Sequence, residues 1–137
     1  MGGSGVERLT VSTRSRTQFI DITGEARRHV RKSGVSEGLL FIYVPHTTAA
    51  VTINENADPD VMADMAHALE KIVPWSDKAY LHGEGNSAAH VKSSMLGCSA
   101  TVIISGGDIV LGSWQGVYFA EFDGPRNRTV FFKIVAG

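Results

Sequence analysis

Leu39-Leu40-Phe41-Ile42-Tyr43-Val44-Pro45 is the stretch of sequence that decides the fold. Its six consecutive apolar residues have the length of a strand and are rich in side chains that favour one. Pro45 ends the run, because proline has no N–H to donate to a neighbouring strand. An unbroken apolar run of this length predicts a central strand that is covered on both faces.

Short helices and strands surround this central strand. The alternation and stop signals predict strands at 6–15, 18–23 and 50–53, and helices at 24–33, from 59 to about 73, and from 87 to about 96. Gly34, Pro74 and Gly97 stand at the helix ends, and Asp58 precedes the second helix as its cap. The buried stripe of that second helix is expected to consist of Val61, Met65, Ala68, Leu69 and Ile72.

The last third of the chain reads as strands. Runs at 100–104 and 109–111 flank Ser105-Gly106-Gly107-Asp108, and runs at 117–122 and 129–135 flank Asp123-Gly124-Pro125-Arg126, so two hairpins are expected. Helices do not alternate regularly with strands, which argues against a doubly wound parallel sheet. We therefore predict an α+β fold: a flexible leader at 1–5, then a single domain at 6–137 with a mixed sheet, curved or folded as a sandwich, and helices packed outside.

Composition excludes several classes of partner. The 137 residues carry 13 basic and 14 acidic side chains, a balance that gives no long-range attraction for nucleic acid or a membrane surface. No apolar run approaches the roughly 20 residues that cross a bilayer. Cys98 is the single cysteine, so the chain can form no internal disulfide, and a cytoplasmic location is expected. Cys98 itself reads as a small packing residue.

Two polar segments follow predicted strands. His46-Thr47-Thr48 comes just after the central strand, where side chains are held rigidly and can still reach a cleft; the alternative is a simple turn. Asn54-Glu55-Asn56 suits a loop that positions a polar ligand, or equally a solvated loop with local capping.

His82-Gly83-Glu84-Gly85-Asn86-Ser87 is the most informative stretch for function. Gly83 and Gly85 allow close approach of the backbone, and the helix that begins afterwards offers N–H groups that attract phosphate or carboxylate. Neither a Walker loop nor a dinucleotide fingerprint is present. The alternative is a tight turn in which Asn86 and Ser87 act as ordinary caps.

His90 lies one helical turn beyond Asn86. With His46 and His82 it makes three histidines near the Glu84 carboxylate, a set that can bind zinc or another divalent ion such as magnesium, or can serve as acids and bases. His29 and His67 lie on predicted helices and are expected at the surface.

Two further features stand near the end of the chain. Trp114, in Gly112-Ser113-Trp114-Gln115-Gly116, either walls a pocket or plugs one end of the core. Glu121 lies within an apolar strand, where a carboxylate must be paired, exposed or functional.

Together these segments resemble the YjbQ-like family, whose members are often labelled secondary thiamine-phosphate synthases. The matching stretches span most of the chain in the family's order: His46-Thr47-Thr48-Ala49-Ala50, Ile53-Asn54-Glu55-Asn56-Ala57-Asp58-Pro59-Asp60, His82-Gly83-Glu84-Gly85-Asn86 with His90, Gly112-Ser113-Trp114-Gln115, and Glu121-Phe122-Asp123-Gly124-Pro125-Arg126. The family usually has threonine where this chain has Ser113, a conservative difference.

The resemblance implies a homotrimer of compact α+β subunits. It also implies that His46, His82, His90 and Glu84 converge on one catalytic site, which can span a subunit boundary. The substrate-binding residues that we then expect are Thr47, Thr48, Asn54, Glu55, Gly83, Gly85, Asn86, Ser87, Trp114, Gln115 and Glu121.

The activity that the resemblance implies is the joining of a pyrimidine diphosphate to a thiazole phosphate, with release of pyrophosphate, as a secondary activity. A metal-dependent hydrolase of a phosphorylated metabolite, with His46, His82 and His90 as ligands and Glu84 as base, is the second hypothesis. A trimer that binds a metabolite without catalysis is the third.

Overall fold

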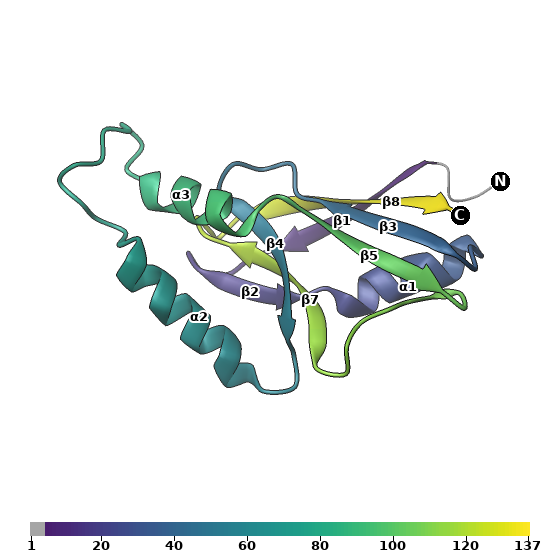
Figure 1. Ribbon diagram of the computed structural model, residues 1–137. Helices are drawn as coiled ribbons and strands as arrows, with labels where there is room; N and C mark the ends of the chain where they lie inside the picture. Colours follow the sequence, from purple (N-terminus) through teal and green to yellow (C-terminus); the bar gives the residue numbers. More distant parts are fainter. Residues whose placement is uncertain (1–4) are drawn as a thin grey trace.

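The computed structural model describes residues 5–137, in which two antiparallel sheets and three helices build an α+β fold (Figure 1). Only Gly5 of the predicted leader lies within the described residues, where it is exposed. The strands are β1 Val6–Ser12, β2 Gln18–Asp21, β3 Gly38–Tyr43, β4 Ala49–Glu55, β5 Ser99–Ser105, β6 Asp108–Ile109, β7 Gln115–Glu121 and β8 Asn127–Ala136. The helices are α1 Thr23–Ser33, α2 Pro59–Ile72 and α3 Ser87–Leu96.

The strands form a five-stranded sheet in the order β1-β8-β3-β5-β6 and a three-stranded sheet in the order β2-β7-β4. The α+β class and the sandwich-like arrangement are confirmed. We expected mixed strand directions, but every ladder described within residues 5–137 is antiparallel. The β5–β6 hairpin is also confirmed, and its turn uses Gly106 and Gly107 at positive φ.

The second predicted hairpin is wrong. The segment Asp123-Gly124-Pro125-Arg126 connects β7 in the smaller sheet to β8 in the larger one, so the two strands do not pair with each other. Its Gly124–Pro125 peptide bond is cis. Turn-forming residues predict a change of chain direction, and they do not specify whether the next strand returns to the same sheet.

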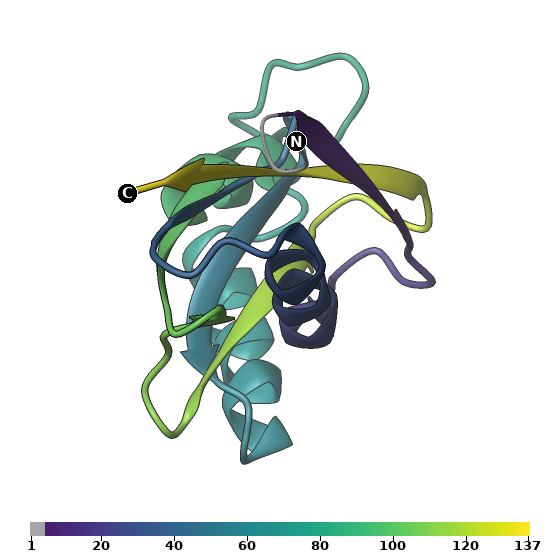
Figure 2. The ribbon, with the colours of Figure 1, turned by 90° about the vertical axis from the view of Figure 1, so that its right-hand side faces the viewer.

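One core lies between the two sheets and is closed by α1, as the view along the sheets shows (Figure 2). Ala26 and Val30 of α1 are fully buried there beside Leu40, Phe119 and Phe132. The helix begins at Thr23 and ends at Gly34, whose φ of 73° is the left-handed conformation expected at this stop.

A second, smaller core lies on the other face of the three-stranded sheet, beneath α2 and α3. It contains Ala50, Ala120, Phe122, Leu69 and Ala89. Strand β7 is therefore the strand covered on both faces: every residue from Gly116 to Glu121 is buried.

Strand β3 does not have the two-sided cover that its sequence predicted. Its buried residues alternate with exposed ones, and Leu39, Phe41 and Tyr43 lie on the open face. Ile103 and Val135 of the neighbouring strands are exposed on that same face. An apolar run thus marks a sheet face that this chain alone leaves uncovered.

The predicted stripe of α2 is correct only in part. Leu69 is buried and Val61 and Met65 are half-buried, as a core-facing stripe requires. Ala68 and Ile72 are exposed, and the neighbouring Met62 and Val73 are buried instead. The start of the helix is as predicted, because the Asp58 side chain accepts a hydrogen bond from the N–H of Asp60. The buried Lys92 of α3 forms a 2.9 Å ion pair with Glu70, which ties α3 to α2.

Candidate functional site

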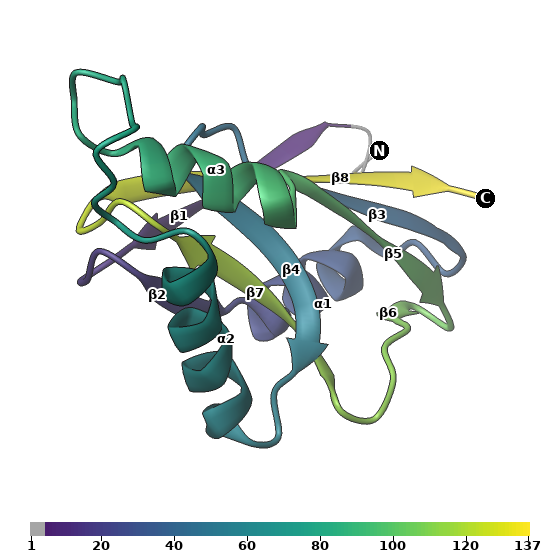
Figure 3. The same cartoon turned by 60° about the vertical axis from the view of Figure 1, so that its left-hand side comes forward.

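The three motif histidines line one polar cavity of about 460 Å³, together with Glu84. His46 lies between β3 and β4, His82 and Glu84 lie in the loop between α2 and α3, and His90 lies in the first turns of α3 (Figure 3). Three of the residues expected to bind substrate, Thr47, Thr48 and Asn86, also line this cavity, and so do Asp123, Arg126 and Arg128. We refer to it as the histidine–arginine cavity.

His46 is held by the backbone of β8. The N–H of Thr129 donates a 2.9 Å hydrogen bond to Nε2 of His46, so this nitrogen carries the lone pair. Burial, with a smaller contribution from the Arg128 guanidinium, lowers the pKa of His46 below its ordinary value. The neutral imidazole therefore carries its proton on Nδ1 and presents that N–H as a donor.

His82 and His90 contact each other in the lining of the cavity. Their ring centroids are 5.2 Å apart, and the rings meet edge to face at 84°. Nε2 of His82 lies 3.7 Å from a carboxylate oxygen of Glu84, and both side chains are substantially exposed. Glu84 thus pairs with a histidine at the rim of the cavity.

Arg128 is fixed by a buried carboxylate. Its Nε donates to Oε1 of Glu121 at 2.8 Å, and its Nη2 donates to Oε2 of Glu121 and to Oγ1 of Thr48. Glu121 also accepts hydrogen bonds from the Thr13 hydroxyl and the Asp123 N–H, both at 2.9 Å. Among residues 5–137, no described hydrogen bond of Arg128 uses Nη1.

Glu121 was expected to contact substrate, and the structure places it elsewhere. It is completely buried and lies behind Arg128 rather than in the cavity lining. Its position resolves the alternatives left open by its sequence: the carboxylate is paired, and it orients the arginine that does reach the cavity.

Asp123, Asn86 and Arg126 form a second connected group in the cavity lining. Asn86 Nδ2 donates to Asp123 at 2.8 Å, and Arg126 Nη2 donates to the same carboxylate oxygen at 3.0 Å. Asn86 therefore does not cap α3 with its side chain. Its Oδ1 is buried without a hydrogen-bond partner among residues 5–137, which leaves a buried acceptor beside the cavity.

The remaining predicted residues are divided between two regions. Gly85 and Ser87 line shallower hollows beside His82, and Gly83 is exposed in the same loop. Asn54, Glu55, Trp114 and Gln115 lie at the far end of the β4–β7 ladder, in which Glu55 pairs with Gln115. From Glu55, strand β4 runs six residues back to Ala49 at the end nearer His46, which is about 20 Å of extended chain. The structure therefore does not bring this group to the cavity within one subunit.

Sequence reasoning missed Arg126 and Arg128 as candidate binding residues. Arg128 occupies an inward-facing position of β8, in step with the buried Val130, Phe132 and Ile134. A charged side chain in that register requires a buried partner, and Glu121 in its apolar strand is the matching signal. The Glu121–Arg128 ion pair could therefore have been predicted from two oppositely charged residues that both occupy buried positions of apolar strands.

The fit of the histidines to a metal ion is poor at His46. A ligating nitrogen must offer a lone pair, but Nε2 of His46 already accepts from Thr129 and Nδ1 carries the proton. Within residues 5–137, no group of three or more histidine, cysteine or acidic side chains has a geometry that could hold a metal ion. In this tautomer His46 therefore has no free lone pair for a metal ion.

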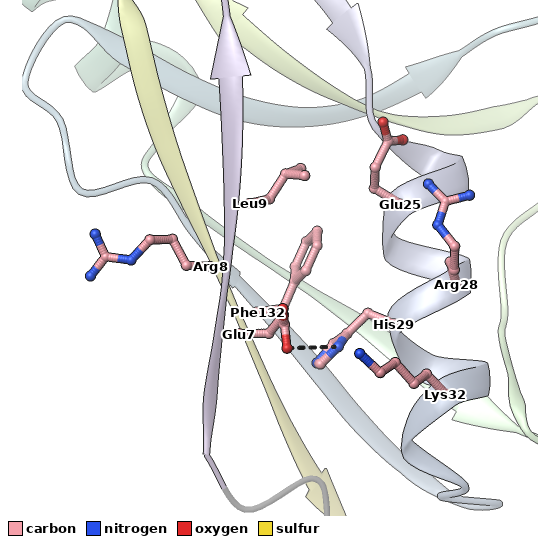
Figure 4. Close-up of a pocket in the computed structure, with 8 residues that line it drawn as sticks. All are labelled: Glu7, Arg8, Leu9, Glu25, Arg28, His29, Lys32 and Phe132. Atoms are coloured by element: carbon pink, nitrogen blue, oxygen red, sulfur yellow. Dashed lines mark ion pairs between the residues drawn. The ribbon is translucent and has the colours of Figure 1, made fainter.

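His29 was expected at the surface. It instead lines a separate cavity of about 200 Å³ between β1 and α1 (Figure 4). Its ring stacks on Phe132 with 5.5 Å between centroids, and Nδ1 lies 4.0 Å from a Glu7 oxygen. The His29 side chain is only 15% exposed, so the predicted surface position is wrong. His67 is exposed, as predicted.

None of the three helices within residues 5–137 has the length and apolar character needed to cross a lipid bilayer.

Comparison with known proteins identifies the family. Residues 7–137 match the family described as UPF0047 protein YjbQ-like. The UPF0047 protein YugU of Bacillus subtilis is 49% identical over 127 residues, covering 93% of this chain and 96% of that protein. A UPF0047 protein of Methanocaldococcus jannaschii is also 49% identical over 127 residues, covering 91% of this chain and 90% of the relative.

Solved structures agree with this match. The crystal structure of an uncharacterized conserved YjbQ/UPF0047 protein from Clostridium acetobutylicum superposes with a TM-score of 0.92 at 50% identity, covering 94% of this chain and 99% of the other. A YjbQ-like protein of Sulfolobus solfataricus gives 0.92 at 29% identity, with 97% of each chain covered. The resemblance drawn from the histidine and glycine motifs is thus confirmed, and the chain belongs to the YjbQ-like UPF0047 family.

Proposed function

We propose that the histidine–arginine cavity binds the phosphate groups of a small molecule, and that the protein is a transferase of the thiamine-phosphate-synthase type. The observation that carries the proposal is the convergence of two guanidinium groups, Arg126 and Arg128, with His46 on one cavity. Guanidinium groups bind phosphate through charge-assisted hydrogen bonds, and a positioned imidazole N–H adds a donor.

The acidic residues of the cavity are compatible with an anion. Asp123 is compensated by Arg126 and by the Asn86 amide, and Glu84 lies next to His82 at the exposed rim. Among the described residues, Arg128 Nη1 makes no described hydrogen bond, so it and the Nδ1–H of His46 are the donors that remain for a phosphate. Because Asn86 does not cap α3, the first N–H groups of that helix are not satisfied by its side chain.

The proposed reaction joins a pyrimidine diphosphate to a thiazole phosphate. The bond between the pyrimidine group and its diphosphate breaks, pyrophosphate leaves with the electron pair, and a lone pair of the thiazole forms the new bond. Negative charge therefore grows on pyrophosphate in the transition state, where Arg126, Arg128 and the Nδ1–H of His46 stabilise it. The proton for the departing group comes, in this proposal, from His82 or His90, whose rings meet in the lining of the same cavity.

Titration calorimetry with inorganic pyrophosphate tests the binding step. We expect wild-type protein to bind, and Arg126→Gln to bind about tenfold more weakly because a charge-assisted contact is lost and Asp123 loses its partner. Arg28→Gln removes the same charge from α1, beside the separate cavity, and should leave the affinity unchanged. Absence of binding at millimolar pyrophosphate, with and without zinc or magnesium, would remove the proposal.

The reaction itself is tested by pyrophosphate release from the pyrimidine diphosphate in the presence of the thiazole phosphate. Release that requires both substrates supports the transferase. Release from the diphosphate alone, abolished by a chelator and restored by zinc, would support the metal-dependent hydrolase instead. Tight binding without turnover would support the metabolite-binding protein.

We also propose that the protein assembles as a homotrimer, as its family resemblance implies. The support is the open apolar face of the larger sheet, made by Leu39, Phe41, Tyr43, Ile103 and Val135. Contiguous exposed apolar surfaces of this kind mark interaction sites. Leu81, which is 97% exposed beside His82, is a second apolar residue that a neighbouring subunit can cover.

A further inference from the structure

A second cavity adjoins the histidine–arginine cavity. Its volume is about 450 Å³, and it lies against α3 and the start of β4, two elements that pack side by side (Figure 3). His46, Thr47 and His90 line both cavities and so form their shared wall. The side chains that belong to the second cavity alone are Ala49, Ser93, Ser94 and Cys98, with Gly97.

The two cavities differ in charge. Besides its histidines, the histidine–arginine cavity is lined by four acidic or arginine side chains, Glu84, Asp123, Arg126 and Arg128. The residues lining the second cavity include no arginine, lysine, aspartate or glutamate, so we call it the neutral cavity. An ionised phosphate in the neutral cavity would have no cationic partner other than the two shared histidines.

The polar groups of the neutral cavity are few. The Ser93 hydroxyl donates to the carbonyl of Thr47 at 2.6 Å and is therefore already engaged. The Ser94 hydroxyl and the Cys98 thiol are exposed, and Ala49 contributes a methyl group. Such a lining suits an uncharged organic group with one or two hydrogen-bonding atoms.

We propose that the neutral cavity holds the uncharged, ring-bearing part of the same molecule whose phosphate groups occupy the histidine–arginine cavity. The inference rests on the proposed function, because it takes phosphate binding as its starting point. His46 and His90 then lie where the ring and the phosphate are joined, which is where a bond must break for pyrophosphate to leave. The inference thus assigns the two parts of the pyrimidine diphosphate of the proposed function to two adjoining cavities.

Cys98 provides a direct readout, since it is exposed, lines the neutral cavity and is the only cysteine of the chain. The rate of its reaction with a coloured disulfide reagent is measured alone, with inorganic pyrophosphate and with a pyrimidine diphosphate. At about ten times its Kd, the pyrimidine diphosphate should slow the reaction about tenfold, because only unliganded protein exposes the thiol. Inorganic pyrophosphate at an equivalent saturation should leave the rate unchanged.

The converse experiment blocks the neutral cavity with a bulky maleimide on Cys98. We expect the labelled protein to keep its affinity for inorganic pyrophosphate and to lose the roughly tenfold gain in affinity that burial of a ring provides. Cys98→Ser, treated with the same reagent, should retain that gain. Ser94→Trp fills the same cavity from α3 without a label and should reproduce the loss.

The results separate this inference from the proposed function. Failure of pyrophosphate to bind would remove the proposed function, while protection of Cys98 by an uncharged pyrimidine alcohol would still support the neutral cavity as a ring site. A pyrimidine diphosphate that binds without protecting Cys98 would overturn the inference, and so would equal protection by pyrophosphate.

Discussion

The backbone N–H of Thr129 donates a hydrogen bond of 2.9 Å to Nε2 of His46. This bond links the turn after β3 to β8, two segments separated by 83 residues in the chain. It decides which nitrogen of the imidazole is left for a ligand, and it makes that nitrogen a donor. A donor is what a phosphate oxygen requires and what a metal ion cannot use.

The first prediction concerns the tautomer of His46. Long-range ¹H–¹⁵N correlation spectra near pH 7 should show Nε2 unprotonated and Nδ1 protonated, because burial and Arg128 hold the pKa of His46 below its usual value. His46→Leu should weaken pyrophosphate binding about tenfold through loss of the Nδ1–H donor. A proton found on Nε2 would contradict the assignment and would make metal ligation through Nδ1 feasible.

The second prediction concerns the pair Glu121–Arg128. Arg128→Met leaves the Glu121 carboxylate buried without its cation and should lower the free energy of unfolding by about 3–5 kcal/mol. The more exposed pair Asp123–Arg126 serves as the matched control, because Arg126→Gln should cost no more than about 1 kcal/mol. Urea unfolding followed by circular dichroism measures both. A cost of about 1 kcal/mol or less for Arg128→Met, like that of the control, would show that Arg128 is not structurally essential.

Local signals in the sequence predicted the helices well. Asp58, Gly34 and Gly97 act through the backbone of neighbouring residues. They therefore specify helix ends in α1, α2 and α3 without contributions from distant parts of the chain. The β5–β6 hairpin is equally local. The role of Asp123-Gly124-Pro125-Arg126 was not predictable, because the destination of β8 depends on its pairing with β1 and β3, which are far away in sequence.

The candidate site was predictable to the extent that its residues are close to helix and strand ends. His46, His82 and His90 line one cavity, and the sequence suggested this from their placement in polar loops and at a helix start, reinforced by the family resemblance. Within one subunit, Asn54 and Trp114 lie away from these histidines. Asn54 is in the β4–β7 ladder and Trp114 directly precedes β7, and an antiparallel ladder carries the two ends of each strand to opposite edges of the fold.

The third prediction is a pH dependence of stability centred on His29. Burial lowers the pKa of His29 despite the nearby Glu7 carboxylate, so the folded protein binds this proton less readily than the unfolded chain does. Its contribution to stability is therefore fully present above the ordinary histidine pKa, near 6.5, and is lost as the pH falls from there toward the lowered value.

His29→Phe keeps an aromatic ring against Phe132 and removes the titration. Urea midpoints at about pH 7.5 and about pH 5.5 should therefore differ less in this variant than in wild-type protein. His67→Gln, at an exposed position of α2, is the matched control and should retain the wild-type difference. If His29→Phe kept the full difference, the acid sensitivity would arise from another group.

The last prediction tests self-association through the open face of the larger sheet. Phe41 lies on β3 at the centre of that face, is 39% exposed, and pairs across the sheet with Lys133 on one side and Thr101 on the other. Phe41→Lys should reduce the light-scattering mass from that of a trimer to that of one chain, because an ammonium group cannot be buried there without a partner. Phe41→Leu keeps an apolar side chain and should preserve the assembly. Circular dichroism must show that both variants are folded, and wild-type protein that stays monomeric at every concentration would refute the assembly outright.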